Sequence, residues 1–324
     1  MKAELIREEG YAKSMQERVL PYVLARREAG SMARKPGEKL LYEHYLADEE
    51  QAVLVLVHGF SESIEKYREC VYYFLQEGYS VWPLQQRSHG GSFRPVREDP
   101  SVVEITDFQD LVEDLHSFVH EVVMPANRDG KPLYLYGHSM GGGVSACYLE
   151  TYPDDFPKAI LSSPMLDLDS GGTPVWMLVL YARWMHLWGK GAKYLPGAEA
   201  FSDKPDFENS CTNSRARYGY FFNEILQHPE MQTAASSLDT AFSFLQLTLF
   251  ARKRSNVDKI KAKVVMFQAG KDGLVPPAGQ DDFMEKLDGR GKKIVIPNAK
   301  HEIYRCCDAD MAEYWPQVFA FLAS

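Results

Sequence analysis

The chain has 324 residues, of which 45% are hydrophobic, 12% aromatic and 25% charged, as in an ordinary globular protein with one large domain or one domain carrying an insertion. The formal net charge of -9 predicts an acidic surface, which argues against nucleic-acid binding and against electrostatic docking on anionic lipids, although an apolar patch can still contact a membrane surface transiently. No run reaches the roughly 18–20 apolar residues that a membrane span requires.

The cysteines and the N-terminal segment indicate in which cellular compartment the protein is expected. The five cysteines are odd in number, include one adjacent pair and show no metal-binding spacing: Cys70, Cys147, Cys211, Cys306 and Cys307. We therefore expect reduced thiols and no metal site. The segment Met1 to Gly10 is charged and lacks the apolar stretch of a secretory signal, so we expect a cytoplasmic protein. The sequence predicts no particular oligomeric state.

Short apolar strands alternate with helices over the first half of the chain. The expected strands are 39–46, 52–57, 80–84, 132–136 and 159–162, and the expected helices are 67–77, 106–123 and 141–152. The run 52–57 is continuously aliphatic, which is typical of a strand buried on both faces of a parallel sheet. The alternation predicts an α/β fold with a mostly parallel central sheet flanked by helices.

This alternation is interrupted between about Met165 and Arg254, where we expect only aromatic-rich helical stretches. It resumes with strands at 263–268 and 292–296 and helices at 277–287 and 310–322. We therefore predict a core in two parts, 1–164 and 255–324, with a helical cap at 165–254. The cap follows the expected strand 159–162 and should cover the carboxyl ends of the strands, where sites form in such sheets.

Large apolar side chains are frequent early in the expected cap. They are Trp176, Leu178, Leu180, Trp184 and Trp188. These residues could line a channel for an acyl chain, rest at a lipid interface or form the core of the cap, and the sequence favours none of these over the others.

The most informative motif is Gly137-His138-Ser139-Met140-Gly141, which follows an apolar strand and precedes a helix rich in small residues. A nucleophile elbow needs this strand–turn–helix context, with Gly137 and Gly141 leaving room for a strained turn. We predict Ser139 to be a nucleophile.

A serine hydroxyl needs a base to accept its proton and an acid to orient that base. For elbows of this kind, the acid and then the histidine follow the serine along the chain. His301 is the histidine that lies in a loop after the last expected strand. Asp272, in a Gly-Lys-Asp-Gly turn after a strand, is favoured as the acid over Asp167 and Asp169.

The tetrahedral intermediate needs two backbone N–H donors for its oxyanion. Met140 directly follows the nucleophile and supplies one of them. The loop His58-Gly59-Phe60 follows the strand 52–57, and Gly59 allows its backbone to turn inward. We assign the second donor to the Phe60 N–H and expect the His58 ring only to pack the loop.

With these motifs in place, the chain resembles the lysophospholipase and monoacylglycerol lipase family of α/β-hydrolases, most closely the bacterial lysophospholipase L2 group. The resemblance covers about residue 43 to the end. It rests on the stretches 57–63, 137–142 and 163–165, and on the cap stretch 209–218. This last stretch looks like the Asn-x-x-Thr-x-Ser-x-x-Arg pattern of those lipases, which implies a segment that anchors the cap.

The sequence departs from the family in one loop. The family usually has Asp-x-Arg-Gly-x-Gly-x-Ser, whereas this chain has Gln85 for the Asp and Ser88 for a Gly. The segment lies beside the expected site, so the preference for a headgroup is in question.

The predicted function is hydrolysis of carboxylic esters through an acyl-enzyme, with lysophospholipids or monoacylglycerols as the substrates that the resemblance implies. This chemistry requires neither a metal nor a cofactor. The alternatives are a short-chain carboxylesterase and a hydrolase homologue that binds a ligand without catalysis.

Overall fold

The computed structural model describes residues 3–96, 99–169, 175–195 and 197–324. Within the helix Val175–Leu187, the side chains of residues 175, 176, 178, 179, 182 and 183 are also outside the description. Across the described residues, no helix combines the length and the apolarity needed to cross a bilayer.

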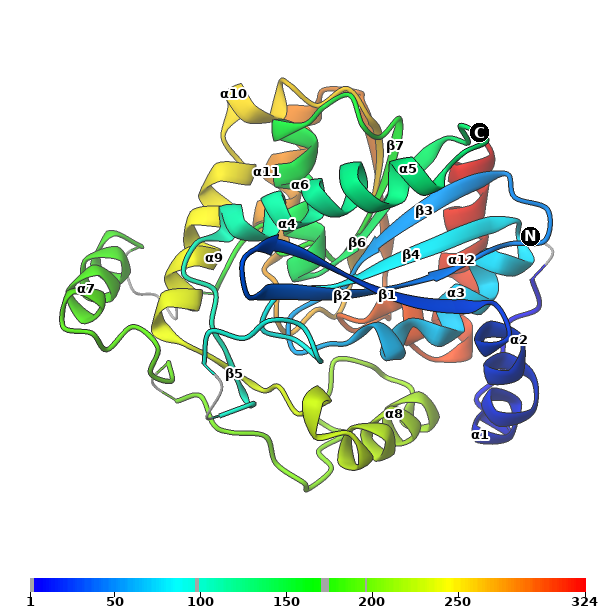
Figure 1. Ribbon diagram of the computed structural model, residues 1–324, viewed down its shortest axis with the longest axis horizontal. Helices are drawn as coiled ribbons and strands as arrows, with labels where there is room; N and C mark the ends of the chain where they lie inside the picture. Colours follow the sequence, from blue (N-terminus) through cyan, green and yellow to red (C-terminus); the bar gives the residue numbers. More distant parts are fainter. Residues whose placement is uncertain (1–2, 97–98, 170–174, 196) are drawn as a thin grey trace.

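A central sheet of eight strands organises the molecule (Figure 1). Its strands are β1 (Arg27–Lys35), β2 (Glu38–Tyr45), β3 (Ala52–Val57), β4 (Tyr79–Gln85), β6 (Leu133–His138), β7 (Lys158–Ser162), β9 (Lys263–Ala269) and β10 (Gly291–Ile296). Their order is β1-β2-β4-β3-β6-β7-β9-β10. Only the pairs β1/β2 and β2/β4 are antiparallel, and the other neighbours are parallel. The prediction of a mostly parallel sheet is confirmed.

Helices cover both faces of this sheet. In the first half they are α1 (Tyr11–Ser14), η1 (Met15–Val19), α2 (Leu20–Leu24), η2 (Ile64–Tyr67), α3 (Arg68–Gln76), α4 (Phe108–Phe118), η3 (Val119–Val123), α5 (Met124–Ala126) and α6 (Met140–Thr151). In the second half they are α7 (Val175–Leu187), α8 (Arg215–Gln227), η4 (Pro229–Met231), α9 (Leu238–Ala251), α10 (Arg254–Val257), α11 (Pro277–Leu287), η5 (Ile303–Arg305) and α12 (Asp308–Ala323).

Strand β3 shows how the two layers of helices are held. Val53, Val55 and Val57 face the hydrophobic core formed with α4, α6, α9 and α11. Leu54 and Leu56 face a second core formed with α3, α12 and the N-terminal helices. Successive side chains of a strand point to opposite faces, so a continuous apolar run supplies both cores. The prediction that this strand is buried on both faces is confirmed.

The interruption in the alternation follows β7, the sixth strand of the sheet in chain order. The segment contains α7, α8, η4 and α9, and also a short strand, β8 (Ala235–Ser236), which pairs in parallel with β5 (Val102–Val103). The expectation of helical stretches alone was therefore incomplete. Two-residue strands carry no alternation that a sequence pattern can reveal.

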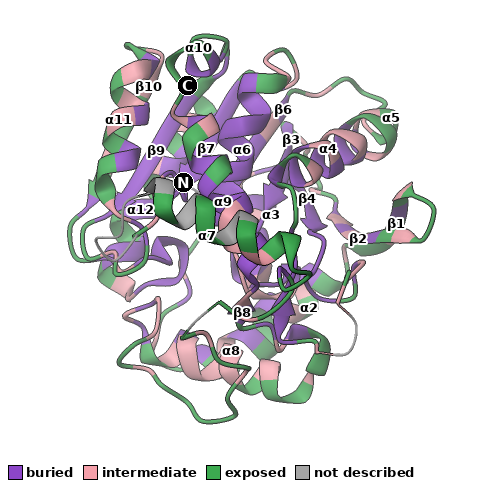
Figure 2. Cartoon of the chain, turned by 90° about the vertical axis from the view of Figure 1, so that its left-hand side faces the viewer, coloured by how far each residue is buried: buried purple, intermediate pink, exposed green. Residues whose placement is uncertain are grey.

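The helices of this segment differ in burial (Figure 2). The α9 residues Leu247 and Ala251 are fully buried in the core shared with α4 and α6. On α7, by contrast, Leu180 and Trp184 are 59% and 53% exposed, and Trp188, directly after the end of this helix, is 66% exposed. These three residues therefore do not form a core of the cap. The side chains of Trp176 and Leu178 lie outside the described residues.

Candidate active site

Ser139 occupies a sharp turn between β6, which ends at His138, and α6, which begins at Met140. Its φ of 52° and ψ of -119° lie in a region that residues other than glycine rarely adopt. Backbone hydrogen bonds hold the turn: the Ser139 N–H donates to the Ser162 carbonyl at 3.0 Å, and the Met165 N–H donates to the Ser139 carbonyl at 2.8 Å. Such local strain is found at nucleophile elbows, where it exposes the hydroxyl.

The two glycines of the motif provide the close approach that the turn needs. A Cβ atom on Gly141 would overlap the carbonyl groups of Val57 and His58 at the end of β3. A Cβ atom on Gly137 would lie 2.6 Å from the Gly141 carbonyl oxygen. A side chain at either position would therefore push the elbow away from the neighbouring strand or helix.

The structure brings together the three residues for which catalytic roles are predicted. The Ser139 Oγ lies 2.7 Å from the His301 Nε2. The His301 Nδ1 lies 2.7 Å from the Asp272 Oδ2. Asp272 follows β9 and His301 follows β10, so the carboxyl ends of parallel strands place both beside the elbow. This geometry allows His301 to accept the Ser139 proton while the carboxylate orients the ring.

The environment of Asp272 favours its ionised form. Burial raises the pKa of this carboxyl, but the hydrogen bond from His301 and those from two backbone amides outweigh burial, and the net pKa is lowered. The amides belong to Leu274 and Val275 and donate to the Asp272 Oδ1 at 2.9 and 3.0 Å. A carboxylate whose pKa is lowered is suited to stabilising an imidazolium.

The rival acids lie elsewhere. Asp167 pairs with the Arg252 guanidinium at 3.5 Å, and its Oδ1 accepts from the Leu168 N–H at 3.0 Å. Asp169 is exposed. Of the three candidates, Asp272 is the one that the structure gives as the hydrogen-bond partner of His301.

The predicted oxyanion loop lies against the elbow. A Cβ atom on Gly59 would lie 2.8 Å from the Glu62 Oε2 and 3.1 Å from the Ser139 Cβ, so a side chain here would crowd both Glu62 and the nucleophile. Met140 is the first residue of α6, where backbone N–H groups have no partner within the helix. The ring of Phe60 packs edge-on against Phe244 of α9, with centroids 5.8 Å apart. The donor roles of Phe60 and Met140 stay predictions.

The His58 ring supports the loop from inside. It is fully buried, and this desolvation lowers its pKa to about 4. Its Nδ1 lies 2.8 Å from the Gly59 carbonyl, and its Nε2 accepts from the Gln86 N–H at 3.1 Å. A neutral ring with both nitrogens engaged suits a packing role in the loop.

Sequence reasoning assigned no role to Glu62, although it lies three residues after Gly59. Its Oε2 accepts from the Gly59 N–H at 2.6 Å, and its Oε1 accepts from the Lys66 Nζ at 2.7 Å and the Tyr304 hydroxyl at 2.9 Å. Burial raises the pKa of Glu62, but Lys66 and the other donors outweigh burial and hold it well below its usual value. Lys66 also contacts Glu302, which adjoins His301. A buried ionic chain thus links the oxyanion loop to the histidine loop.

The loop that departs from the family pattern is well bonded. Ser88 adopts a φ of 62°, in the left-handed region that the glycine of the family pattern adopts without strain. The Ser88 hydroxyl donates to the Glu104 carbonyl at 2.7 Å. The Gln85 Oε1 accepts from the Ile64 N–H at 3.0 Å, and its Nε2 lies 3.0 Å from the His58 Nε2. The Gln85 side chain therefore stabilises the oxyanion loop through hydrogen bonds.

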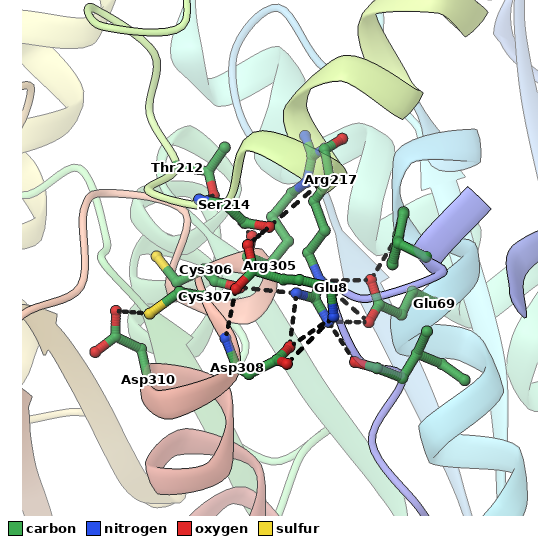
Figure 3. A network of polar contacts seen from close by, with 12 residues as sticks. Glu8, Glu69, Thr212, Ser214, Arg217, Arg305, Cys306, Cys307, Asp308 and Asp310 are labelled. Carbon is green, nitrogen blue, oxygen red and sulfur yellow. Dashed lines mark hydrogen bonds and ion pairs between the residues drawn. The ribbon is translucent and has the colours of Figure 1, made fainter. Parts of the chain in front are cut away.

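The stretch 209–218 ties the inserted segment to the core through Arg217 (Figure 3). The Arg217 guanidinium is fully buried and pairs with Glu69 of α3 at 2.9 Å. It also donates to the carbonyls of Ile6 at 2.6 Å and Cys306 at 3.1 Å. Thr212 donates to the Arg305 carbonyl at 2.7 Å. One side chain thus joins the N-terminal segment, the core, the inserted segment and the histidine loop.

A strained serine after a parallel strand, with an aspartate and a histidine following in that order, defines a serine hydrolase of the α/β-hydrolase class. The chain belongs to the Hydrolase_4 family, described as serine aminopeptidase, S33, whose family model matches residues 48–306.

Its relatives include two lipid esterases by name. It is 26% identical to the probable lysophospholipase L2 of Haemophilus influenzae, over 84% of each chain. It is 25% identical to the monoacylglycerol lipase of Mycolicibacterium smegmatis, over 87% of this chain and 92% of the relative. The predicted family resemblance is confirmed.

A solved structure supports the fold. A soluble variant of the monoglyceride lipase of Saccharomyces cerevisiae, in complex with a substrate analogue, superposes with a TM-score of 0.73 at 18% identity, over 91% of this chain and 94% of that one. The α/β-hydrolase fold predicted from the sequence is therefore confirmed.

Proposed function

We propose that this protein hydrolyses carboxylic esters of the lysophospholipid or monoacylglycerol class through an acyl-enzyme on Ser139. The observation that carries the proposal is the continuous hydrogen-bonded line from the Ser139 Oγ through His301 to Asp272, with 2.7 Å at each step. Membership of the serine hydrolase family and the names of the relatives support the reaction class and the lipid substrates.

The reaction follows from the positions of these groups. His301 takes the Ser139 proton as the hydroxyl attacks the ester carbonyl, and Asp272 stabilises the imidazolium. The N–H groups of Met140 and Phe60 hold the oxyanion. His301 then protonates the leaving alcohol, which gives the acyl-enzyme. Water, deprotonated by the same histidine, releases the carboxylic acid and regenerates Ser139.

The exposed face of α7 supports a lipid substrate. Large apolar side chains recur at spacings of three and four residues along the described part of this helix and at the residue that follows it: Met177, Leu180, Tyr181, Trp184, Leu187 and Trp188. Such a stripe suits transient contact with a lipid surface, where tryptophan and tyrosine rings sit at the boundary with water. Because the chain carries a net charge of -9, apolar contact has to supply most of this affinity.

We also propose that the protein works in a reducing compartment such as the cytoplasm. All five cysteines are free thiols, and Cys70 and Cys147 are buried. Stable disulfides are typical of secreted proteins, so their absence from these five positions supports this location.

The proposal is tested first with a fluorophosphonate probe, which labels an activated serine. We expect the wild-type protein to be labelled and the Ser139→Ala variant to be unlabelled at equal folding, judged by circular dichroism. An unlabelled wild-type protein would contradict the hydrolase assignment and favour a homologue that only binds a ligand.

A second measurement addresses the substrate. Lysophosphatidylcholine, a monoacylglycerol and a chain-length series of p-nitrophenyl esters are compared by kcat/KM. We expect the long-chain esters to be preferred. A maximum at acetate or butyrate would instead indicate a short-chain carboxylesterase.

A further inference from the structure

A second group of polar side chains lies at the far end of α6 from the elbow. His116 of α4 and His120 of η3 are four residues apart on continuous helical backbone, so both imidazoles lie on one face. Asp155 follows the last turn of α6 and meets them there. The possible ligand atoms of these three residues all lie within 4.8 Å of one another.

The individual distances suit a shared ion. The His120 Nε2 lies 3.0 Å from the Asp155 Oδ2, and the His116 Nδ1 lies 3.9 Å from the same oxygen. In a tetrahedral zinc site with bonds of about 2.0–2.1 Å, ligand atoms are about 3.3 Å apart. The observed separations lie on either side of this value, so small rotations of the side chains would bring all three onto one ion.

Neighbouring aromatic residues hold these side chains in place. The Tyr148 hydroxyl donates to the Asp155 Oδ2 at 2.6 Å. The His116 ring stacks on Tyr152, with centroids 3.7 Å apart and planes inclined by 10°. The Tyr152 hydroxyl in turn donates to Glu113 at 2.6 Å. Hydrogen-bonded carboxylates and oriented imidazoles are the usual support of metal ligands.

The local electrostatics also favour a cation. The carboxylates of Asp155, Glu113 and Glu121 act on the His116 ring and attract positive charge. A divalent ion would satisfy these carboxylates without protonating the ring.

We propose that His116, His120 and Asp155 form a binding site for one divalent transition-metal ion of the zinc class, with water completing the coordination. Two imidazoles and one carboxylate suit zinc, nickel, cobalt or copper, whereas magnesium and calcium prefer oxygen ligands alone. The ion would tie helix α4 to the segment after α6, the helix whose first turn carries Met140. The site takes no part in the ester hydrolysis proposed above.

The expectation of no metal site came from the spacing of the cysteines and from the chemistry of a serine nucleophile. The sequence signal for the proposed site is the pair His116-x-x-x-His120, since histidines four residues apart on a helix are a common half-site. Asp155 lies 35 residues further along the chain than His120, so no local pattern could have included it.

The test uses the full chain, purified without a histidine tag and treated with a chelator that is then removed. Co²⁺ is titrated while its visible absorption is recorded, and Zn²⁺ binding is followed by calorimetry. We expect one equivalent to bind to the wild type, with Zn²⁺ displacing Co²⁺. The His120→Asn and Asp155→Asn variants should each bind at least about tenfold more weakly, because each removes one ligand.

His228→Asn is the matched control, because His228 also sits at the surface beside a carboxylate, 3.4 Å from Glu230, but belongs to no such cluster among the described residues. Its metal affinity should equal that of the wild type. Absence of saturable binding by the wild type, or equal binding by the His120→Asn variant, would overturn the proposal and leave a hydrogen-bonded cluster. Ester hydrolysis by these variants is measured separately and should be unchanged, so a failure of either proposal is seen on its own.

Discussion

Helices α7 and α9 both come from the inserted segment, yet they meet different surroundings. The α9 helix packs on α4 and α6, and its Leu247 is fully buried. The α7 helix lies next to α9 and stands out from the body of the molecule, and its Leu187 is 83% exposed (Figure 1). The apolar composition of a helix therefore indicates that it packs against an apolar surface, but it does not indicate which surface. For α9 the partner is the core that carries the site, and for α7 we propose a lipid surface.

If the catalytic residues belong to the core and not to α7, the largest effect should come from a change in the proposed triad. In Asp272→Asn, the amide can no longer hold the His301 ring in the required tautomer. We expect kcat to fall by about 10⁴-fold for every ester, water-soluble or lipid, as in the corresponding change in other serine hydrolases. Steady-state kinetics with p-nitrophenyl acetate and with a long-chain monoacylglycerol give the values.

The matched control is Asp167→Asn, because Asp167 is the rival acid and pairs with Arg252 instead of His301. Its kcat should stay within about threefold of the wild type, because the carboxylate that bonds to His301 is that of Asp272. The free energy of unfolding should change by about 0.5 kcal/mol or less, as for most substitutions at the surface. A loss of kcat in this variant comparable with that of Asp272→Asn would contradict the assignment of the acid.

The second prediction compares the two helices directly. Leu247→Ala should lower the free energy of unfolding by about 2–5 kcal/mol, because it leaves a cavity between α9 and α6. Leu187→Ala should change it by no more than about 0.5 kcal/mol, because this side chain is already in water. Urea denaturation of the two variants measures the difference. Equal losses would mean that Leu187 is buried in solution and that the contrast between α7 and α9 is wrong.

A third change tests whether the buried ionic chain around Glu62 affects kcat. In Glu62→Gln, the Gly59 N–H keeps an uncharged acceptor, whereas Lys66 loses one of its two carboxylate partners. We expect kcat to fall about tenfold with little change in KM, less than the 10²–10³ of removing an oxyanion donor outright. Such a split identifies Glu62 as a positioning residue.

Glu65→Gln is the control for this change, because Glu65 lies three residues further along the chain, in η2, and is only half-buried. Its kcat should equal that of the wild type. A proportional rise in KM without loss of kcat in Glu62→Gln would show instead that the residue acts on substrate binding.

Much of the core could be predicted because its signals are local. Each of these signals occupies a few consecutive residues and predicts a single local structure. They are the aliphatic run of β3, the glycines around Ser139 and the turn at Asp272. The chain order of serine, acid and histidine then reduced the choice of partners. For these reasons the mostly parallel sheet follows from the sequence, whereas the bounds of the insertion and the catalytic roles of the residues that meet at the elbow stay predictions.

Other features depend on contacts between distant segments. Strand β1 lacks an apolar alternation, since it lies at the sheet edge and is largely exposed. The role of Glu62 depends on Tyr304, which is 242 residues away. The boundary of the cap at 254 also stays a prediction, because α9 belongs to the inserted segment by sequence and to the main core by packing.

The smallest expected effect concerns α7 itself. Replacing Leu187, at the end of α7, and Trp188, directly after it, by serine removes two of the most exposed apolar side chains among those described, 83% and 66% accessible. We expect the double variant to bind zwitterionic phosphatidylcholine vesicles several-fold more weakly in a sedimentation assay, and to hydrolyse lipid presented on them correspondingly more slowly. The rate with p-nitrophenyl acetate should not change, because α7 carries no residue of the proposed triad.

Leu249→Ser is the matched control, because Leu249 is a 49% exposed leucine on α9. If α7 meets the lipid as an apolar stripe, Leu249→Ser should leave vesicle binding unaltered, and raising the salt concentration should not weaken the binding of the wild type, since apolar contact is not screened. Equal loss of binding in the control and the double variant would mean that any exposed leucine contributes and that α7 has no special role. Strong weakening by salt would mean that charged groups carry the contact, against the expectation from the net charge of -9.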